Sequence, residues 1–167
     1  MGRALLVSGP CGAGKTTVGA ELSRLLGCPV VEVDAVKLER RGTTVTSRLD
    51  HFTEAGRRAA AALRQQGCAI VVEAFAGESW VDLVIRELPE GTQVSHFYLW
   101  CDLAEAVRRK AGELSPEVVG GQFQRFNGAT FPGRVSFDTT ARPATEVASE
   151  IAAMFLGSGT RPVANSE

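Results

Sequence analysis

The chain reads Gly9-Pro10-Cys11-Gly12-Ala13-Gly14-Lys15-Thr16 directly after a short apolar run. This stretch fits the pattern Gly-x-x-x-x-Gly-Lys-[Ser/Thr] without a mismatch, a pattern that connects a strand to a helix. Its glycines allow a tight turn that brings successive N–H groups against phosphate oxygens. The helix expected to begin at Lys15 adds the positive end of its dipole. The stretch therefore predicts a binding site for the phosphates of a nucleotide.

The side chains of this loop have separate expected roles. Lys15 places a cation between the β- and γ-phosphates of ATP, where it also serves catalysis, and the Thr16 hydroxyl completes the coordination of Mg²⁺. The expected cofactors are therefore ATP and Mg²⁺. The residues of this stretch expected to bind ATP are Gly9, Cys11, Gly12, Ala13, Gly14, Lys15, Thr16 and Thr17.

Outward from the loop, apolar runs alternate with longer segments of helical periodicity. The predicted strands are residues 3–8, 29–33, 68–75, 94–101 and 134–137. The predicted helices are residues 15–26, 49–66, 79–88, 103–114, 115–126 and 145–156. Such alternation is typical of βαβ units. It predicts one α/β domain with a mainly parallel sheet and helices on both faces.

The sequence indicates one domain over residues 1–156, with a lid near residues 108–128 that closes over ATP. Residues 157–167 hold few apolar side chains and are expected to be disordered. No apolar stretch approaches the roughly 20 residues needed to span a bilayer. No secretory signal is recognisable either, so a cytoplasmic location without membrane contact is expected.

Composition and charge exclude some classes of partner. The chain has 167 residues and a formal net charge of −1, which argues against an extended nucleic-acid-binding face. The protein is expected to be a monomer or a homodimer. Its four cysteines form no Cys-x-x-Cys pair and are expected to be buried thiols in a reducing compartment rather than disulfides or metal ligands. They are Cys11, Cys28, Cys68 and Cys101.

Two predicted strands end in a carboxylate, at the sheet edge where ligands of parallel sheets bind. Asp34 is the candidate general base for an acceptor hydroxyl, with a turn or helix-cap aspartate as the alternative. Glu73 is a candidate Mg²⁺ ligand through water, with a solvent-facing glutamate as the alternative. Glu32 alternates with apolar positions and is expected to face the other side of its strand.

Basic residues beyond the fourth predicted strand are candidates to neutralise the charge of the migrating phosphoryl group. Arg109 is the first choice as a catalytic residue and Arg125 the second. Arg108 is expected to bind the nucleotide, and Lys110 is a further candidate. The alternative is a solvated helix face, which accounts for most arginine runs.

Two further segments have candidate binding roles. Residues 138–143 follow the fifth predicted strand and are candidates to hold the adenine, through Arg142 or the backbone of Thr140. An ordinary connection between strand and helix is the alternative. Basic residues that follow Asp34 favour an anionic acceptor, with a solvated helix as the alternative. They are Arg40, Arg41, Arg48, His51 and Arg57.

With these motifs, the chain resembles the small P-loop kinases related to nucleoside monophosphate kinases. Within that group it is similar to shikimate kinase, gluconate kinase and chloramphenicol phosphotransferase. The resemblance covers nearly all of residues 1–156. It rests on residues 9–17, Asp34, residues 69–73, residues 96–102 with the arginine-bearing helix that follows, and residues 135–140.

This resemblance implies the three-layer α/β P-loop NTPase fold, in which a five-stranded parallel sheet of order 2-3-1-4-5 has helices on both faces. It also implies ATP with Mg²⁺ and a small hydroxylated acceptor. In proteins like chloramphenicol phosphotransferase the aspartate that falls on Asp34 is a base. Their lid arginines fall loosely on Arg108, Arg109 and Arg125. The chain departs from the family at Glu73, where aspartate is more usual, and no acceptor signature is recognisable after Asp34.

Together these observations predict an ATP-dependent kinase that moves the γ-phosphoryl group to a hydroxyl of a small molecule, either a metabolite or an antibiotic-like compound. One alternative is a kinase for the 5′-hydroxyl of nucleotides or nucleic acids. The other is a nucleotide-binding regulatory module that transfers no phosphoryl group. The identity of the acceptor stays open.

Overall fold

Five parallel strands form the central sheet in the computed structural model, which describes residues 2–39, 48–74, 78–126 and 134–157. The strands are β1 (Arg3–Ser8), β2 (Val30–Glu32), β3 (Cys68–Glu73), β4 (Gln93–Trp100) and β5 (Val135–Asp138). Their order is β2-β3-β1-β4-β5, and every pairing is parallel. The predicted fold class and strand order are confirmed.

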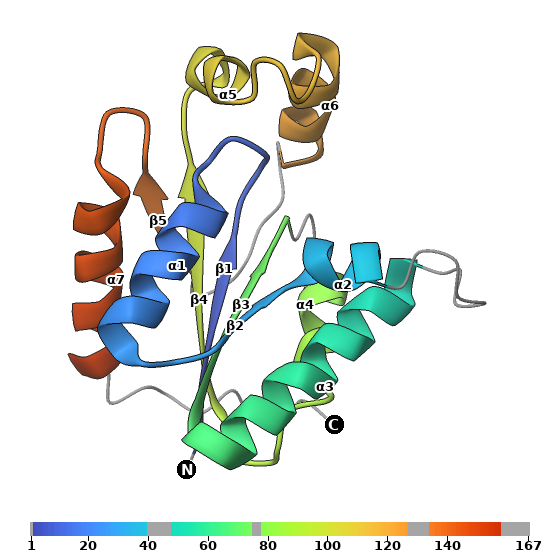
Figure 1. The fold of residues 1–167 in the computed structure, drawn as a ribbon, viewed down its shortest axis with the longest axis vertical. Helices are drawn as coiled ribbons and strands as arrows, with labels where there is room; N and C mark the ends of the chain where they lie inside the picture. The colour runs from blue at the N-terminus through green and yellow to red at the C-terminus, as the bar shows by residue number, and fades with distance from the viewer. Residues whose placement is uncertain (1, 40–47, 75–77, 127–133, 158–167) are drawn as a thin grey trace.

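Helices cover both faces of this sheet, which gives three layers (Figure 1). They are α1 (Lys15–Leu26), α2 (Val33–Glu39), α3 (Arg48–Gln66), α4 (Glu78–Ile85), α5 (Leu103–Arg109), α6 (Pro116–Phe126) and α7 (Ala144–Gly157). Helices α1 and α7 pack together on one face, and α3 and α4 pack together on the other. Helices α5 and α6 stand beyond the carboxyl ends of the strands.

The central strand β1 is apolar at consecutive positions because it is buried on both faces. Leu5 and Val7 belong to the core under α1 and α7. Ala4 and Leu6 belong to the core under α3 and α4. All four side chains are fully buried, so the end of β1 holds the loop that follows it at a fixed place on the carboxyl edge of the sheet.

The structure differs from the sequence prediction between β2 and α3. The predicted strand 29–33 ends at Glu32, and α2 begins at Val33. Val33 and Val36 are buried three residues apart, which is the spacing of one helix face. Two apolar positions are too few for this period to stand out in the sequence. Asp34 therefore lies in the first turn of a helix, not in a loop after a strand.

The segment predicted as a lid contains two short helices. The predicted helix 103–114 ends early, because α5 stops at Arg109 and Gly112 then adopts a left-handed φ of 85°. Helix α6 begins at Pro116, as expected from the preference of proline for a first turn. The closing motion of this segment stays a prediction. The tail predicted as disordered lies outside the described residues from 158 onward.

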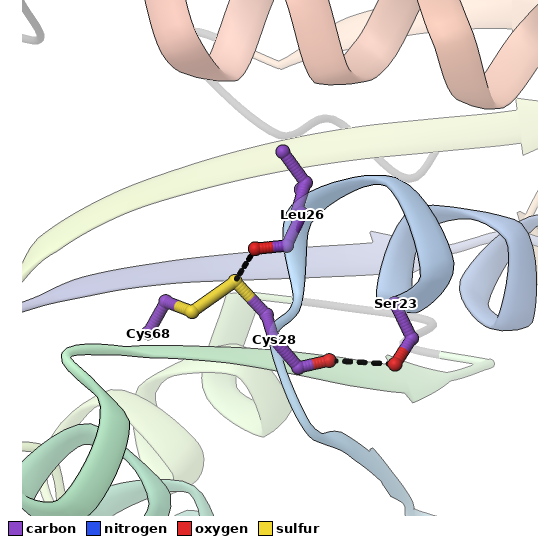
Figure 2. Close-up of a disulfide and its surroundings, with 4 residues drawn as sticks. All are labelled: Ser23, Leu26, Cys28 and Cys68. Atoms are coloured by element: carbon purple, nitrogen blue, oxygen red, sulfur yellow. Dashed lines mark hydrogen bonds between the residues drawn. A yellow bond between two sulfur atoms is a disulfide. The ribbon is translucent and has the colours of Figure 1, made fainter.

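Two of the four cysteines form a disulfide, so the expectation of four thiols was wrong. Cys28 follows α1 and Cys68 begins β3, and their Cα atoms are 5.4 Å apart at the amino edge of the sheet (Figure 2). The hydroxyl of Ser23 donates to the carbonyl of Cys28 at 2.8 Å. The fold joins residues 40 positions apart, which spacing along the chain did not indicate. Cys11 and Cys101 are free and buried.

Candidate nucleotide and acceptor site

The loop between β1 and α1 approaches its neighbours so closely that two of its glycines admit no side chain. A Cβ atom on Gly9 would clash with the carbonyl oxygen of Leu99, and one on Gly12 would lie 2.8 Å from the Cα of Ala106. Gly12 and Gly14 also have φ angles of 77° and 84°, which side chains disfavour. The glycines of the motif are therefore required by both backbone conformation and packing.

Lys15 lies across this loop at the start of α1. Its ammonium group donates to the carbonyl oxygen of Pro10 at 2.8 Å. Burial lowers the pKa of Lys15, and the carboxylates of Glu73 and Asp34 act in the opposite direction. The cation is thus held by the loop itself, in the position from which it can meet a phosphate chain.

A cavity of about 330 Å³ opens beside the loop. It is lined by Cys11, Gly12, Gly14, Lys15, Thr16, Thr17, Glu32, Asp34, Val72, Arg109 and Lys110. The cavity thus unites the phosphate-binding motif with the candidate base Asp34 and the candidate cation Arg109. Two strands, three helices and the loop after β1 contribute to its walls, so only the fold brings these groups together.

Glu32 and Lys110 line the cavity, although the sequence gave them no firm role. Glu32 was expected to face the other side of its strand, but β2 ends at this residue. Three strand positions are too few for the alternation of apolar and polar residues to indicate which side Glu32 faces. Lys110 follows the last residue of α5 and pairs with Glu113 at 2.7 Å. Its position in the cavity depends on the early end of α5, which the sequence did not indicate.

Asp34 and Glu73 are joined by a lysine that sequence reasoning did not single out. Lys37 donates to Asp34 Oδ1 at 2.7 Å and to Glu73 Oε2 at 2.9 Å. The backbone N–H of Ala74 donates to the other oxygen of Glu73 at 2.6 Å. Glu73 is only 3% exposed and does not line the cavity, whereas the side chain of Asp34 is 77% exposed. The three-residue spacing of Asp34 and Lys37 is a signal that would have found the pair.

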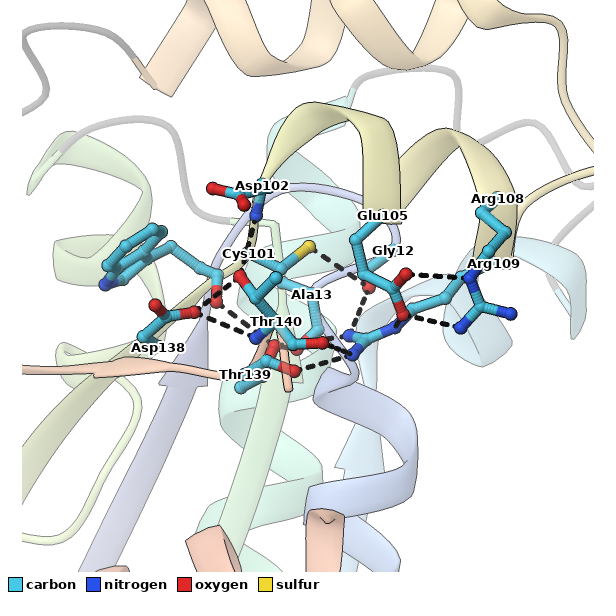
Figure 3. Close-up of polar contacts among 11 residues, drawn as sticks. Gly12, Ala13, Cys101, Asp102, Glu105, Arg108, Arg109, Asp138, Thr139 and Thr140 are labelled. Carbon is cyan, nitrogen blue, oxygen red and sulfur yellow. Dashed lines mark hydrogen bonds and ion pairs between the residues drawn. The ribbon is translucent and has the colours of Figure 1, made fainter. Parts of the chain in front are cut away.

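Arg109 connects the phosphate loop to the segment that follows β5 (Figure 3). One terminal nitrogen donates to the carbonyl of Gly12 at 3.0 Å, and the other donates to the carbonyl of Thr139 at 2.6 Å. Its Nε pairs with Glu105 at 2.7 Å. Hydrogen bonds from Arg108 and Arg109 lower the pKa of Glu105 to about 2. In this structure Arg109 clamps two loops together at the edge of the cavity.

The segment after β5 is tied to the same place by Thr139 and Thr140. The buried hydroxyl of Thr139 donates to the carbonyl of Ala13 at 3.0 Å. Asp138 accepts from both the N–H and the hydroxyl of Thr140, at 2.8 and 2.6 Å, and these contacts lower the pKa of Asp138. The N–H of Asp102 donates to the Thr140 hydroxyl at 3.0 Å. The candidate adenine segment is therefore ordered against the phosphate loop.

The other arginines predicted for the site lie outside the cavity lining. Arg108 is 73% exposed and pairs with Glu105. Arg142 pairs with two glutamates of α7, at 2.8 and 2.7 Å. Arg125 is exposed in the last turn of α6. Arg108 and Arg125 are exposed on helices, as the alternative of a solvated helix face expects. Arg142 is partly exposed in the connection between β5 and α7, and the binding roles of all three stay predictions.

The basic residues predicted for the acceptor side are mostly neutralised or not described. Arg57 of α3 pairs with Glu87, which follows α4, at 3.1 Å. Arg40 and Arg41 lie outside the described residues, as does the side chain of Arg48. The observed part of this side thus offers carboxylates and one shared ammonium, not a cluster of unpaired cations.

Two absences hold within the described ranges. No group of three or more His, Cys, Asp and Glu side chains there is arranged to hold a metal ion by itself. No helix in those ranges has the length and apolar character to cross a membrane.

Known proteins resemble the chain in sequence over most of its length. The model of a family described as an AAA domain matches residues 5–126. A shikimate kinase of Thermobifida fusca is 34% identical over 113 residues, covering 64% of this chain and 62% of that protein. A shikimate kinase of Rhodococcus jostii is 30% identical over 125 residues, covering 71% of each chain. The chain thus spans slightly less than two thirds of the first relative and slightly more of the second.

A solved structure shares the fold over nearly the whole chain. A gluconokinase from Sinorhizobium meliloti 1021 superposes with a TM-score of 0.70 at 20% identity, covering 92% of this chain and 91% of that one. At this identity the likeness shows the fold alone. The sequence matches go further, because the family model covers well over half of the chain. The chain belongs to the AAA domain family and, by sequence, to the group of small P-loop kinases that includes the shikimate kinases.

Proposed function

We propose that the protein transfers the γ-phosphoryl group of ATP to a hydroxyl of a small molecule. The observation that carries this proposal is the single cavity that joins the phosphate loop to the carboxylate of Asp34. Phosphoryl transfer needs a positioned phosphate chain, cations around it and a group that accepts the hydroxyl proton. The lining residues offer a group for each need: the loop backbone for the phosphates, Lys15 and Arg109 as cations, and Asp34 as the proton acceptor.

ATP would bind with its phosphates on the loop and its base toward the segment after β5. The ammonium of Lys15 has only the Pro10 carbonyl to leave in order to reach the β- and γ-phosphates. Arg109 and Thr139 already hold the base-side segment against the loop. We assign Arg109 to nucleotide binding through this clamp, and Lys110 joins Lys15 as a cation of the cavity.

Mg²⁺ would be held by oxygen groups that face the cavity. Thr16 supplies a hydroxyl and Glu32 a carboxylate, which are the ligand types that Mg²⁺ takes together with phosphates and water. The ion, when bound, neutralises charge that develops between the β- and γ-phosphates. Glu73 is less suited to this task because it is buried outside the cavity lining and its two oxygens accept from Lys37 and the Ala74 N–H.

The acceptor would approach Asp34 from the side of α2 and α3. One oxygen of Asp34 accepts from Lys37, and a carboxylate has a second oxygen for the hydroxyl of the acceptor. The loose transition state of phosphoryl transfer requires this proton acceptance only late in the reaction. Relatives named shikimate kinase and a fold neighbour named gluconokinase favour hydroxylated organic acids and polyols as the first acceptors to test.

The test is ADP release from Mg·ATP across a panel of shikimate, gluconate, sugars, amino sugars and nucleosides, with the products identified by mass spectrometry. Asp34→Asn should lower the rate with the active acceptor by ~10²–10⁴ and leave ATP affinity unchanged. Asp82→Asn, which alters an exposed carboxylate of α4, is the matched control. A fully active Asp34→Asn protein would remove Asp34 from the mechanism.

The same panel separates the proposal from the two alternatives. Phosphorylation of a nucleoside or an oligonucleotide 5′-hydroxyl alone would identify a 5′-kinase. Tight binding of Mg·ATP with no product from any acceptor would instead favour a regulatory module.

A further inference from the structure

Glu73 is the one charged residue that is buried within the described ranges. It ends β3, in register with Ser8 at the end of the central strand β1. A buried carboxylate is unfavourable unless it is paired and hydrogen-bonded. Lys37 and the N–H of Ala74 meet this requirement with one contact to each oxygen. Each oxygen of Glu73 therefore has a donor from the protein, and the charge of Glu73 is compensated without a metal ion.

Lys37 links this buried group to the exposed candidate base. Its ammonium lies one helical turn beyond Asp34 on α2 and contacts both carboxylates at 2.7 and 2.9 Å. It also lies 5.9 Å from the ring centre of Phe52. Burial alone would lower the pKa of Lys37, but attraction to Glu73 and hydrogen bonds to both carboxylates raise it overall. The ammonium is thus a stable bridge between the sheet and the cavity.

We propose that Glu73 is a positioning residue that acts through Lys37 on Asp34, and that it is not a magnesium ligand. This inference rests on the proposed role of Asp34 as the base. Glu73 fixes Lys37 to the rigid end of the sheet, and Lys37 fixes one oxygen of Asp34 on an otherwise exposed helix turn. The chain of contacts holds the second oxygen of Asp34 where an acceptor hydroxyl meets the γ-phosphate.

The positions of the candidate metal ligands support a positioning role for Glu73 rather than metal binding. Thr16 and Glu32 line the cavity, whereas Glu73 lies behind it and is 2% exposed at its side chain. A flexible side chain on the surface loses catalytic geometry easily, so a base such as Asp34 gains from a support anchored in the core. The short helix α2 offers few other anchors, since Val33 and Val36 are its buried residues.

The first experiment measures metal and nucleotide binding, which do not depend on the acceptor. Mn²⁺ is titrated by electron paramagnetic resonance in the presence of ADP, and Mg·ATP by calorimetry. Glu73→Gln should bind both within twofold of the unmodified chain. Glu32→Gln should weaken Mn²⁺ binding about tenfold or more. Weakening of Mn²⁺ binding by that amount in Glu73→Gln would overturn the proposal.

The second experiment is a double-mutant cycle in turnover with the active acceptor. Glu73→Gln and Lys37→Met should each lower kcat about tenfold or more, with little change in the KM for ATP. The double variant should be no slower than Lys37→Met alone, because both changes break one chain of contacts. Lys37→Arg should recover part of kcat. Effects that multiply in the double variant would show independent roles and contradict the proposal.

Folding is controlled within the same set of variants. Lys37→Met leaves the buried carboxylate of Glu73 without its cation and should lower the melting temperature. The double variant removes that carboxylate charge, so its melting temperature should rise again while kcat stays low. A double variant that recovers both stability and kcat would show that the contacts of Lys37 with Asp34 and Glu73 have only a structural role. If no acceptor is ever phosphorylated, the proposed function fails, but the Mn²⁺ titration still decides whether Glu73 binds metal.

Discussion

The nucleotide side and the acceptor side of the cavity differ in the groups that form them. On the nucleotide side, glycine backbone packs against β4 and α5, and Arg109 and Thr139 tie the loops together through carbonyl groups. On the acceptor side, Asp34 stands on a two-turn helix and is supported by the ammonium of Lys37. The first side is the one proposed to bind the phosphate chain that all nucleoside triphosphates share. The second is made of side chains, which can change with the acceptor while the fold stays the same.

Loss of the cation of the nucleotide side should have the largest effect. Lys15→Ala should lower kcat by on the order of 10³, because no other group replaces the ammonium at the transferred phosphoryl group. Initial rates of ADP release with the active acceptor check this value. Lys15→Arg keeps the positive charge but changes the shape of the cation, so its kcat should lie between those of the unmodified chain and Lys15→Ala. Turnover of Lys15→Ala at the original rate would show that the loop is not the transfer site.

The acceptor side is secured at its far end by the disulfide. Cys28 lies just before β2, the strand that leads into α2, so this crosslink restrains the edge of the sheet that carries Asp34. Replacing Cys28 and Cys68 together by serine should lower the free energy of unfolding by about 2–4 kcal/mol, measured in urea. ATP affinity should not change.

Reductant is the control for that experiment. It should destabilise the unmodified chain by a similar amount and have no effect on the double serine variant. Alkylation under non-reducing, denaturing conditions should label only Cys11 and Cys101. Labelling of four thiols in freshly purified protein would show that the crosslink is not formed.

One added methyl group tests how tightly the backbone of the phosphate loop packs on the nucleotide side. Gly12→Ala should weaken Mg·ATP binding roughly tenfold, because the new Cβ would meet Ala106 at 2.8 Å and φ is 77°. Gly120→Ala is the matched control, since a Cβ on Gly120 of α6 would meet nothing within 4 Å. Calorimetry of both variants checks the prediction. Equal affinity in Gly12→Ala would mean that the loop has room to relax.

The smallest expected effect is a pH dependence on the nucleotide side. The folded-state pKa of Glu105 is lowered to about 2 by hydrogen bonds from Arg108 and Arg109, below its ordinary value of 4.5. A lowered pKa means that this stabilisation is fully present above about pH 4.5 and is lost as the pH falls toward 2. The free energy of unfolding, measured in urea between pH 3 and 7, should depend less steeply on pH in Glu105→Gln than in the unmodified chain. The same pH dependence in both proteins would show that the ion pairs of Glu105 with Arg108 and Arg109 contribute nothing measurable to stability.

The sequence predicted the nucleotide side better than the acceptor side, for physical reasons. A phosphate loop needs glycines and a lysine at fixed spacing, so a local stretch of eight residues carried the prediction. The alternation of strands and helices predicted the parallel sheet, and the family resemblance supplied its strand order. Lys37 and Glu73 meet across 36 positions, and no local pattern indicates such a pair. The disulfide and the inward position of Glu32 likewise depend on where β2 begins and ends.

Arg109 illustrates the limit of residue-level prediction at the site. The sequence indicated that an arginine after β4 would reach the nucleotide, and Arg109 does line the cavity. Its contacts with Gly12 and Thr139 are to carbonyl groups, which sequence cannot reveal because every residue has one. Its neighbour Arg108 has the same chemistry but points to solvent. Helix phase, set by where α5 begins, distinguishes the two.

The account rests on a triphosphate bound by the loop before α1. Calorimetric titration of the whole chain with Mg·ATP tests this most directly. We expect saturable binding at one site per chain, with affinity reduced sharply in Lys15→Ala and unchanged in Asp82→Asn. Absence of saturable heat with either ATP or GTP, or equal binding by Lys15→Ala, would contradict it.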